Sequence, residues 1–222
     1  MTKISIEWGG FVLLEPMSFI LNWVMMLQSF FYFHKLKEWR NSSFSINWRW
    51  FFLLFGLSAF FGGPSHLFYH YTGLFGKIPG WSSAVLAVSF MELAMVSLTN
   101  HEYLKSRLEK LVYLKLFITI ASLTYNFHFD VVLFHTIGMA VFIFVPGFIF
   151  LFQRRNELNY LVLGVFSLLL ALPFRLYEVD FHTWFNRDDI GHVMMMTALY
   201  LFFRGVREYE SNALSVPQVS KG

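Results

Sequence analysis

Seven apolar runs, each close to the length needed to cross a bilayer, follow one another along this chain. They cover residues 11–33, 50–71, 81–99, 111–129, 131–152, 159–174 and 189–204. A transmembrane helix needs roughly 20 mostly apolar residues, and the connections between these runs are short. We therefore expect an all-α, polytopic membrane protein. It would be a single seven-helix bundle over residues 1–210, with a flexible C-terminal tail over residues 211–222.

Composition supports a membrane protein and excludes several other classes. The chain is 56% hydrophobic and only 14% charged, whereas soluble domains carry about 25% charged residues. It has no cysteine, which excludes a disulfide framework and a thiolate metal site. The net charge of +3 does not indicate nucleic-acid binding. The expected partners are membrane lipids and a lipid substrate or ligand, and the oligomeric state is left open.

The basic residues orient the expected bundle. If the N-terminus is outside, the outer loops hold only Lys3, Lys77, Arg175 and Arg187 of the 17 lysines and arginines, and the other 13 lie on the inner side. Loops on the cytoplasmic side of membrane proteins carry an excess of Lys and Arg. This asymmetry predicts an external N-terminus and a cytoplasmic C-terminus.

Polar side chains gather at the outer end of this expected bundle. The second run ends in FFGGPSHLFYHYTG and the seventh begins with DDIGH, and both of these segments lie near the outer face. Glu15 and Asn22 lie in the outer half of the first run. Six of the eight histidines lie on this side, at positions 66, 70, 128, 135, 182 and 192.

The helical spacing of residues in two of these segments indicates a candidate metal site. His66 and His70 are four residues apart, as are Asp188 and His192, and Asp189 and His192 are three apart. Residues at these spacings share one face of a helix. Three nitrogen or oxygen ligands with an open position form a catalytic zinc site. We expect zinc to be bound by His66, His70, His192 and Asp188.

Three further residues are candidates for catalysis beside such a metal. Asp189 or Ser65 would steady a metal-bound hydroxide or the developing oxyanion. Glu15 is a candidate because a carboxylate within a membrane is costly and usually functional.

The same residues also fit plainer roles. Asp188 or Asp189 could serve only as a cap on the seventh helix, whose N-terminus favours negative charge. Glu15 could pair with Arg175 or a histidine. Glu92, in the middle of the third run, is expected to face the bundle interior, protonated or bonded to Asn126, without a catalytic role.

The layout resembles the CREST superfamily of seven-helix membrane proteins, which includes the alkaline ceramidases and the progestin and adipoQ receptors. The segment SHLFYH is similar to the family's second-span element, with Ser65 and either His66 or His70. DDIGH stands where the family has a His-x-x-x-His pair, with His192 at its second histidine and Asp188 in place of its first. LLEPMSFILNW carries the acidic residue and asparagine that members tend to have in the first span.

The chain also differs from that family. Its third run has no aspartate, and the spacing between Ser65 and the histidines is not the usual one. Where the family chemistry applies, the resemblance implies that zinc-activated water attacks an amide or ester in a lipid.

These observations predict a membrane-embedded, zinc-dependent hydrolase of a lipid amide or ester, similar to a ceramidase. The first alternative is a non-enzymatic seven-helix receptor or sensor, in which the polar outer cluster is a ligand pocket. A further alternative is a haem or proton-transfer protein, because paired histidines on facing helices also suit haem iron.

Overall fold

The chain begins with a β-hairpin that precedes the first helix. The computed structural model describes residues 4–39, 42–154, 156 and 158–215. Strands β1 (Ser5–Trp8) and β2 (Phe11–Leu14) pair antiparallel. Gly9 and Gly10 form the turn with φ of 58° and 82°, a left-handed conformation that glycine adopts without steric cost. Our expectation that the first helix begins at Phe11 is wrong, because this glycine pair turns the chain back into a hairpin.

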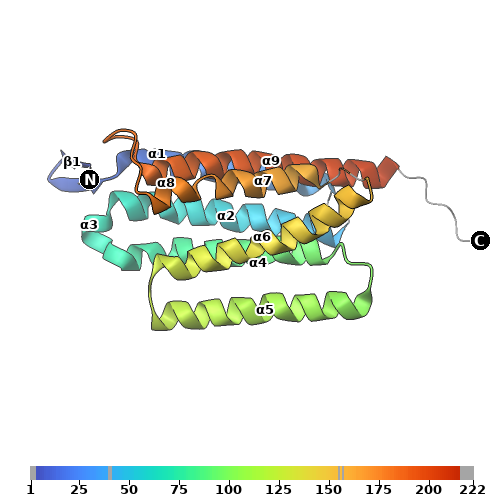
Figure 1. The fold of residues 1–222 in the computed structure, drawn as a ribbon. Coiled ribbons are helices and arrows are strands. Elements are labelled where there is room, and N and C mark those ends of the chain that lie inside the picture. Colours follow the sequence, from blue (N-terminus) through green and yellow to red (C-terminus); the bar gives the residue numbers. More distant parts are fainter. Residues whose placement is uncertain (1–3, 40–41, 155, 157, 216–222) are drawn as a thin grey trace, which may run out of the picture.

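The rest of the described chain is mostly helical. The elements after the hairpin are α1 (Pro16–Lys35), η1 (Leu36–Trp39), α2 (Ser43–Leu67), α3 (Tyr69–Thr72), η2 (Gly73–Lys77), α4 (Ile78–Val96), α5 (Glu102–Tyr125), α6 (Phe129–Phe152), α7 (Asn159–Leu169), α8 (Leu172–Leu176) and α9 (Arg187–Ser215). The long helices lie side by side between two ends of the molecule (Figure 1). The hairpin, α3 and α8 lie at one end, which we call the hairpin end, and the C-terminus lies at the other.

Four helical segments among the described residues are long and apolar enough to cross a membrane. They are Ser43–Leu67, Tyr69–Val96, Phe129–Phe152 and Asn159–Leu176. Large apolar side chains also cover the outside of the bundle, and Phe117, Phe134 and Phe152 are more than two-thirds exposed. Such an extended apolar surface is typical of a protein that faces lipid. The chain is therefore a helical membrane protein.

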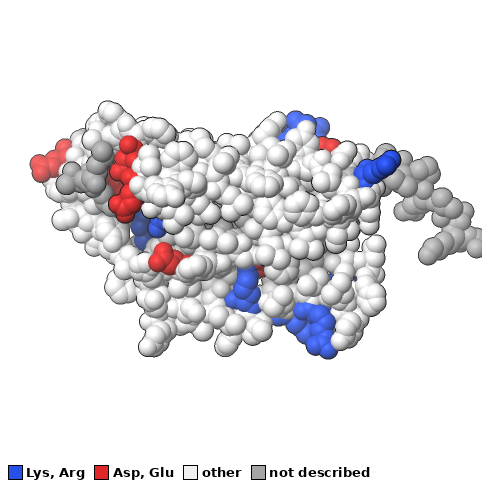
Figure 2. Space-filling view, viewed as in Figure 1, with Lys and Arg blue, Asp and Glu red and all other residues white. Residues whose placement is uncertain are grey.

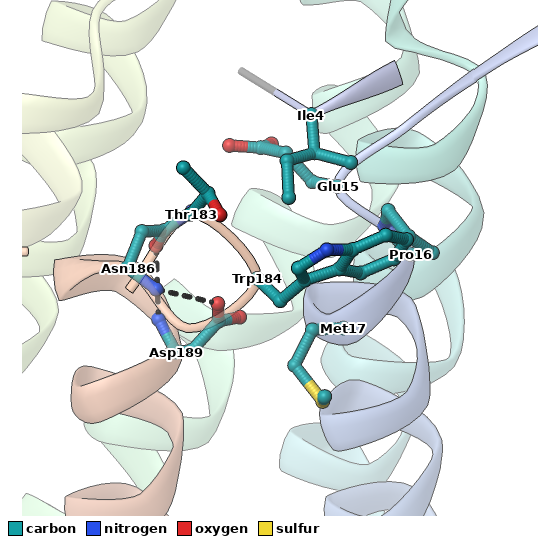
Figure 3. Close-up of a pocket in the computed structure, with 8 residues that line it drawn as sticks. All are labelled: Ile4, Glu15, Pro16, Met17, Thr183, Trp184, Asn186 and Asp189. Carbon is teal, nitrogen blue, oxygen red and sulfur yellow. Dashed lines mark hydrogen bonds between the residues drawn. The ribbon is translucent and has the colours of Figure 1, made fainter. Parts of the chain in front are cut away.

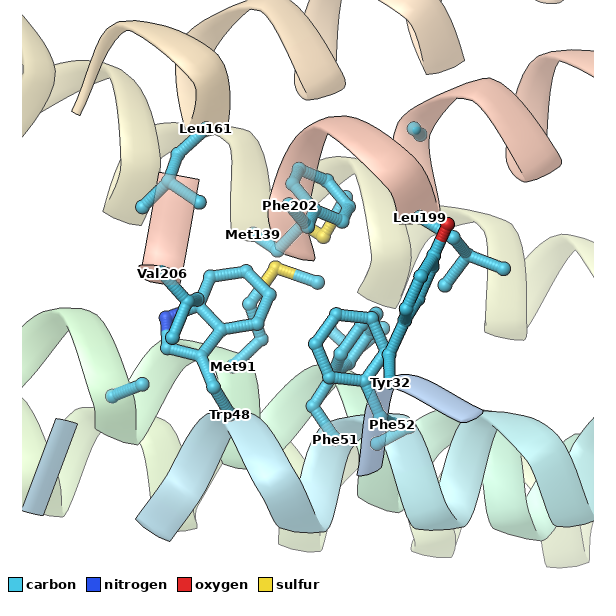
Figure 4. Close-up of a cluster of buried hydrophobic side chains, with 14 of the residues drawn as sticks. Tyr32, Trp48, Phe51, Phe52, Met91, Met139, Leu161, Leu199, Phe202 and Val206 are labelled. Carbon is cyan, nitrogen blue, oxygen red and sulfur yellow. The ribbon is translucent and has the colours of Figure 1, made fainter. Parts of the chain in front are cut away.

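Helix α2 packs mainly against α1 and α4, helix α9 packs mainly against α7 and α1, and aromatic side chains connect α2 with α9. In the largest buried cluster, Trp48 of α2 contacts Phe202 of α9 with ring centroids 5.3 Å apart, and Met91 and Met139 add the apolar faces of α4 and α6 (Figure 4). At the end opposite the hairpin, buried Glu210 of α9 accepts hydrogen bonds from the hydroxyl groups of Ser42 and Ser45 at the start of α2. These contacts join an early helix to the last one.

Two boundaries differ from the sequence-based expectation. The final helix α9 continues to Ser215, so it includes the first five residues of the segment that we expected to be a tail. Residues 216–222 lie outside the described part of the chain. Lys115, which we counted among the inner-side residues, lies instead in the middle of α5 with its side chain bonded to Glu92.

Candidate functional site

Six polar side chains from α2, α9 and the start of α1 meet at the hairpin end of the bundle, and we call them the polar cluster. They are Glu15, Ser18, Asn22, His66, Asp189 and His192. Helix α1 packs against both α2 and α9, which is why residues more than 170 positions apart in the sequence come into contact. The structure therefore brings together polar groups from three of the helices that the sequence singled out.

Glu15 and His66 form a buried pair within the cluster. The Nδ1 atom of His66 lies 2.8 Å from Oε2 of Glu15, whose side chain is only 3% exposed. Glu15 has a left-handed backbone, with φ 48° and ψ 56°, and its amide donates to the carbonyl of Ile4 in the hairpin. Non-glycine residues with positive φ are strained, and such strain is concentrated at functional sites. Glu15 is thus held in a costly conformation that aims its carboxylate at His66.

The second histidine, His192, lies beside the first. Its ring centroid is 5.9 Å from that of His66. The Nδ2 atom of Asn22 lies 3.0 Å from His192 Nε2 and also donates to the carbonyl of Ser18 at 2.8 Å. Because an amide nitrogen can only donate, Nε2 is the acceptor and the ring proton lies on Nδ1. That Nδ1 is buried and has no hydrogen-bond partner among the described residues.

Asp189 connects the cluster to the start of α9. Its Oδ1 accepts from the Ser18 hydroxyl at 2.7 Å, and its Oδ2 accepts from the amide of Asn186 at 3.0 Å. The side chain of Asn186 in turn accepts from the amides of Asp188 and Asp189. This reciprocal arrangement is a capping box. Asn186 is therefore the cap of α9, while Asp189 both completes the box and enters the cluster.

A small pocket opens between the hairpin, α1 and the loop before α9 (Figure 3). It is lined by Ile4, Glu15, Pro16, Met17, Thr183, Trp184, Asn186 and Asp189. Two carboxylates of the cluster line this pocket, and both polar and apolar side chains form the remainder of its wall. The pocket therefore places two carboxylates of the cluster beside apolar side chains at the hairpin end.

Three residues expected in the site are not brought into the cluster. Asp188 turns toward Arg175, with Oδ1 3.4 Å from Nη1. His70 is exposed and packs against Tyr71, because the helix breaks at Phe68 and the histidine falls on the separate helix α3.

The third residue, Ser65, is buried but donates to the carbonyl of Gly62 within its own helix. Ser18, Asn186 and Trp184 were not expected at the site from the sequence. Only Asn186 carries a recognisable signal, because it lies three residues before Asp189.

The residues of the cluster fit part of a zinc site. With a zinc–nitrogen bond of about 2.1 Å and tetrahedral angles, two imidazole centroids lie roughly 5 Å apart, close to the 5.9 Å between His66 and His192. Because Nδ1 of His66 is bonded to Glu15, Nε2 is the atom of His66 that is free to bind a metal. This carboxylate–histidine arrangement is common at zinc sites. Zinc on His192 Nδ1 requires the ring proton to move to Nε2 and the Asn22 amide to turn.

The set of ligands is not complete in this arrangement. Among the described residues, no three His, Cys, Asp or Glu side chains already converge as metal ligands. Asp189 is a further candidate in the cluster, and both of its oxygens are engaged by Ser18 and Asn186. A third ligand therefore requires rotation of a carboxylate.

The fold and the cluster define a helical membrane protein with a buried histidine–carboxylate site. It belongs to a family of unknown function, DUF6962, whose match covers residues 17–211. The match includes every member of the polar cluster except Glu15. No curated protein and no solved structure matches the chain.

Proposed function

We propose that this protein is a membrane-embedded hydrolase that cleaves an amide or ester bond of a lipid, with the polar cluster as its active site. The observation that carries the proposal is the buried Glu15–His66 pair beside His192. The similarity of SHLFYH and DDIGH to elements of the CREST superfamily supports it, and we propose a distant relationship to that superfamily. A lipid suits the pocket because carboxylates and apolar side chains line it together.

Zinc is the proposed cofactor, held by His66 and His192 with Asp189 as the third ligand. When bound, zinc supplies a water molecule of lowered pKa and polarises a carbonyl oxygen. The roles of the protein's own residues follow from their contacts. Glu15 holds the proton on His66 Nδ1 and so fixes the direction of Nε2, Ser18 positions Asp189, and Asn22 orients the ring of His192.

We further propose that all seven long helices cross the membrane, counting α7 and α8 as one crossing, with the hairpin end outside. Figure 2 supports this orientation, because Lys and Arg lie mostly toward the C-terminal end of the visible face and Asp and Glu toward the hairpin end. A reporter fused after Gly222 should be cytoplasmic and one inserted at Lys77 external. The reverse pattern would place the polar cluster at the cytoplasmic face.

Metal analysis of the purified protein tests the cofactor. We expect stoichiometric zinc in the wild type and its loss in His66→Ala and His192→Ala. His70→Ala is the matched control, because His70 is exposed and outside the cluster, and it should retain the metal. Equal zinc content in all four proteins, or none in the wild type, would contradict the proposal.

Hydrolysis is measured separately from metal content. Ceramide-type amides and simple acyl esters in detergent micelles are the probes, and released fatty acid is the readout. We expect Glu15→Gln to slow release while zinc is retained, because Glu15 orients a ligand without contacting the metal. Release that is equal in wild type and Glu15→Gln would remove Glu15 from the mechanism.

One observation favours a second function, that of a receptor or sensor that binds a lipid without cleaving it. Within the described part of the chain, the Nδ1–H of His192 is a buried donor without an acceptor, and a carbonyl oxygen of a ligand would satisfy it. Asn22→Asp distinguishes the two functions. The carboxylate of the variant accepts a hydrogen bond from Nε2 of His192, so the ring proton lies on Nε2 and the lone pair on Nδ1. Zinc binding at Nδ1 is then strengthened, whereas binding of a carbonyl oxygen at Nδ1 is abolished.

A further inference from the structure

A second group of buried polar side chains lies between α4, α5 and α6, apart from the helices that build the polar cluster. Its centre is Glu92, in the middle of α4 and 0% exposed. Oε1 of Glu92 accepts from Nζ of Lys115 on α5. Oε2 is buried and has no hydrogen-bond partner among the described residues. The expected bond to Asn126 is absent from the contacts of Glu92, and Lys115 takes that place.

Lys115 reaches Glu92 across the surface of α6. Its Nζ also donates to the carbonyl of His135 at 3.0 Å. A Cβ atom at Gly138 would lie 3.5 Å from Nζ, so the glycine leaves room for the ammonium group. The Lys115 side chain is 23% exposed whereas that of Glu92 is 0% exposed. Lys115 therefore lies between the buried carboxylate and the outer surface of the bundle.

His135 completes the group on α6 and is 3% exposed. Its Nε2 lies 3.2 Å from the carbonyl of Val85, so Nε2 carries a proton. Its Nδ1 lies 2.8 Å from Oγ1 of Thr119, and that hydroxyl also lies 2.8 Å from the carbonyl of Lys115. One hydroxyl hydrogen cannot serve both acceptors. Together with Glu92 Oε2, the group has more acceptors than hydrogens.

An acceptor that lacks a hydrogen in a buried network can bind a proton. We propose that Glu92, Lys115 and His135 bind one exchangeable proton, and that its uptake on Glu92 releases α5 from α4. In this step an O–H bond forms at Oε2 of Glu92 and the carboxylate becomes a neutral acid. Lys115 keeps its proton, so the net charge of the pair changes from zero to +1. The ion pair is lost, and Lys115 remains bonded to the carbonyl of His135.

How much proton uptake affects α5 depends on the other contacts that hold this helix to the bundle. Helix α5 lies at the outside of the bundle (Figure 1), and its apolar contact with α4 and α6 is a small separate cluster around Val85, Leu123 and Val132. Helix α5 itself buries only Val112, Thr119 and Leu123 of its 24 residues, which is a modest attachment. The Glu92–Lys115 pair adds a polar link between α5 and α4 to this attachment, and breaking a buried pair is costly.

Other charged groups on the neighbouring elements are engaged elsewhere. On α2, Arg49 donates to the carbonyl of Phe33 and His66 binds Glu15. Lys77 of η2 lies over the ring of Tyr69.

On α6, Asp130 pairs with His128. On α5, the charged residues other than Lys115 lie in its first turns, and Lys105 pairs with Glu102. Glu92, Lys115 and His135 are thus the titratable groups that face one another here.

Infrared difference spectroscopy of the full-length protein in lipid nanodiscs tests proton binding. We expect the C=O band of a protonated carboxylic acid to appear as pH falls and to be missing in Glu92→Gln. Lys115→Met should shift the appearance of the band to higher pH, because the cation that favours the carboxylate is gone. This second variant also keeps the test decisive if Glu92→Gln does not fold. Identical titrations in all three proteins would overturn the proposal.

Hydrogen exchange over residues 102–125 tests the release of α5. After correction for the intrinsic pH dependence of exchange, we expect the α5 amides of the wild type to exchange at least about tenfold faster at the acidic end of the titration, because a buried pair is broken. Glu92→Gln should exchange fast at every pH. Glu210→Gln, which alters a buried carboxylate outside this group, should keep the wild-type response. Exchange in α5 that is independent of pH in the wild type would refute the coupling.

Discussion

The contact between Gly62 and Asn22 gives the sharpest test of how the polar cluster is built. Gly62 lies on α2, and a Cβ atom at this position would lie 2.8 Å from Oδ1 of Asn22 and 3.4 Å from its Cγ. Gly62→Ala therefore cannot be accommodated unless the Asn22 amide moves. That amide holds both the carbonyl of Ser18 and the ring of His192, so its movement disturbs the site directly.

The expected change in the free energy of unfolding of Gly62→Ala is the sum of three contributions. Replacing a helical glycine by alanine stabilises a helix by about 1 kcal/mol. Overpacking costs about 1–3 kcal/mol, and two lost hydrogen bonds cost about 1 kcal/mol each. We expect Gly62→Ala to lower the free energy of unfolding by about 2–4 kcal/mol.

Gly191→Ala is the matched control for this substitution. Gly191 is also helical and precedes His192, but a Cβ atom there would meet nothing within 4 Å. It carries the same helical gain without the clash, so the difference between the two variants isolates the Asn22 contact. Denaturant unfolding in detergent micelles measures the stability, and ¹⁵N NMR of the His192 ring reports whether the proton stays on Nδ1. A Gly62→Ala protein as stable as Gly191→Ala, with an unchanged ring spectrum, would show that the Asn22 amide does not depend on the space left by Gly62.

Three further predictions use the same unfolding assay. Asp189→Asn should cost about 1–2 kcal/mol, because an amide has one acceptor oxygen where the carboxylate uses two, while Asp188→Asn should cost less than about 1 kcal/mol because its pair with Arg175 is exposed. Phe202→Ala should cost about 3–5 kcal/mol, since its ring is buried against α2. Glu210→Ala should cost about 1–3 kcal/mol by leaving two serine hydroxyls without their acceptor.

Hydrophobic run length predicted the long helices well, because each run has to be buried or face lipid along its whole length. It failed where a short local signal overrides that pattern. The Gly9–Gly10 pair between Trp8 and Phe11 is a two-residue hairpin turn, and it makes Phe11–Leu14 a strand rather than the first turn of a helix. That signal was present in the sequence and outweighs the apolar character of the residues after it.

The site could be predicted only in part. Spacing placed Asp188 and Asp189 equally well against His192, and the choice between them depends on the cap, because Asn186 binds Asp189 back into the helix start. The assignment of His70 failed because a single residue, Phe68, leaves the helical conformation. The Glu92–Lys115 pair had no signal in the sequence, because its register depends on how two separate helices pack.

The polar cluster can form only after all of the helices that carry its residues have been synthesised and packed together. Glu15, Asn22 and His66 leave the ribosome well before Asp189 and His192, which lie on α9. A nascent chain that has inserted only its earlier helices has four of the six cluster residues, with the Ser18 hydroxyl and the Asn22 amide lacking their α9 partners. The site is therefore completed only when α9 docks between α1 and α7. Under the proposed function, truncated or incompletely assembled copies would lack activity, so hydrolysis would be restricted to proteins with a completed bundle.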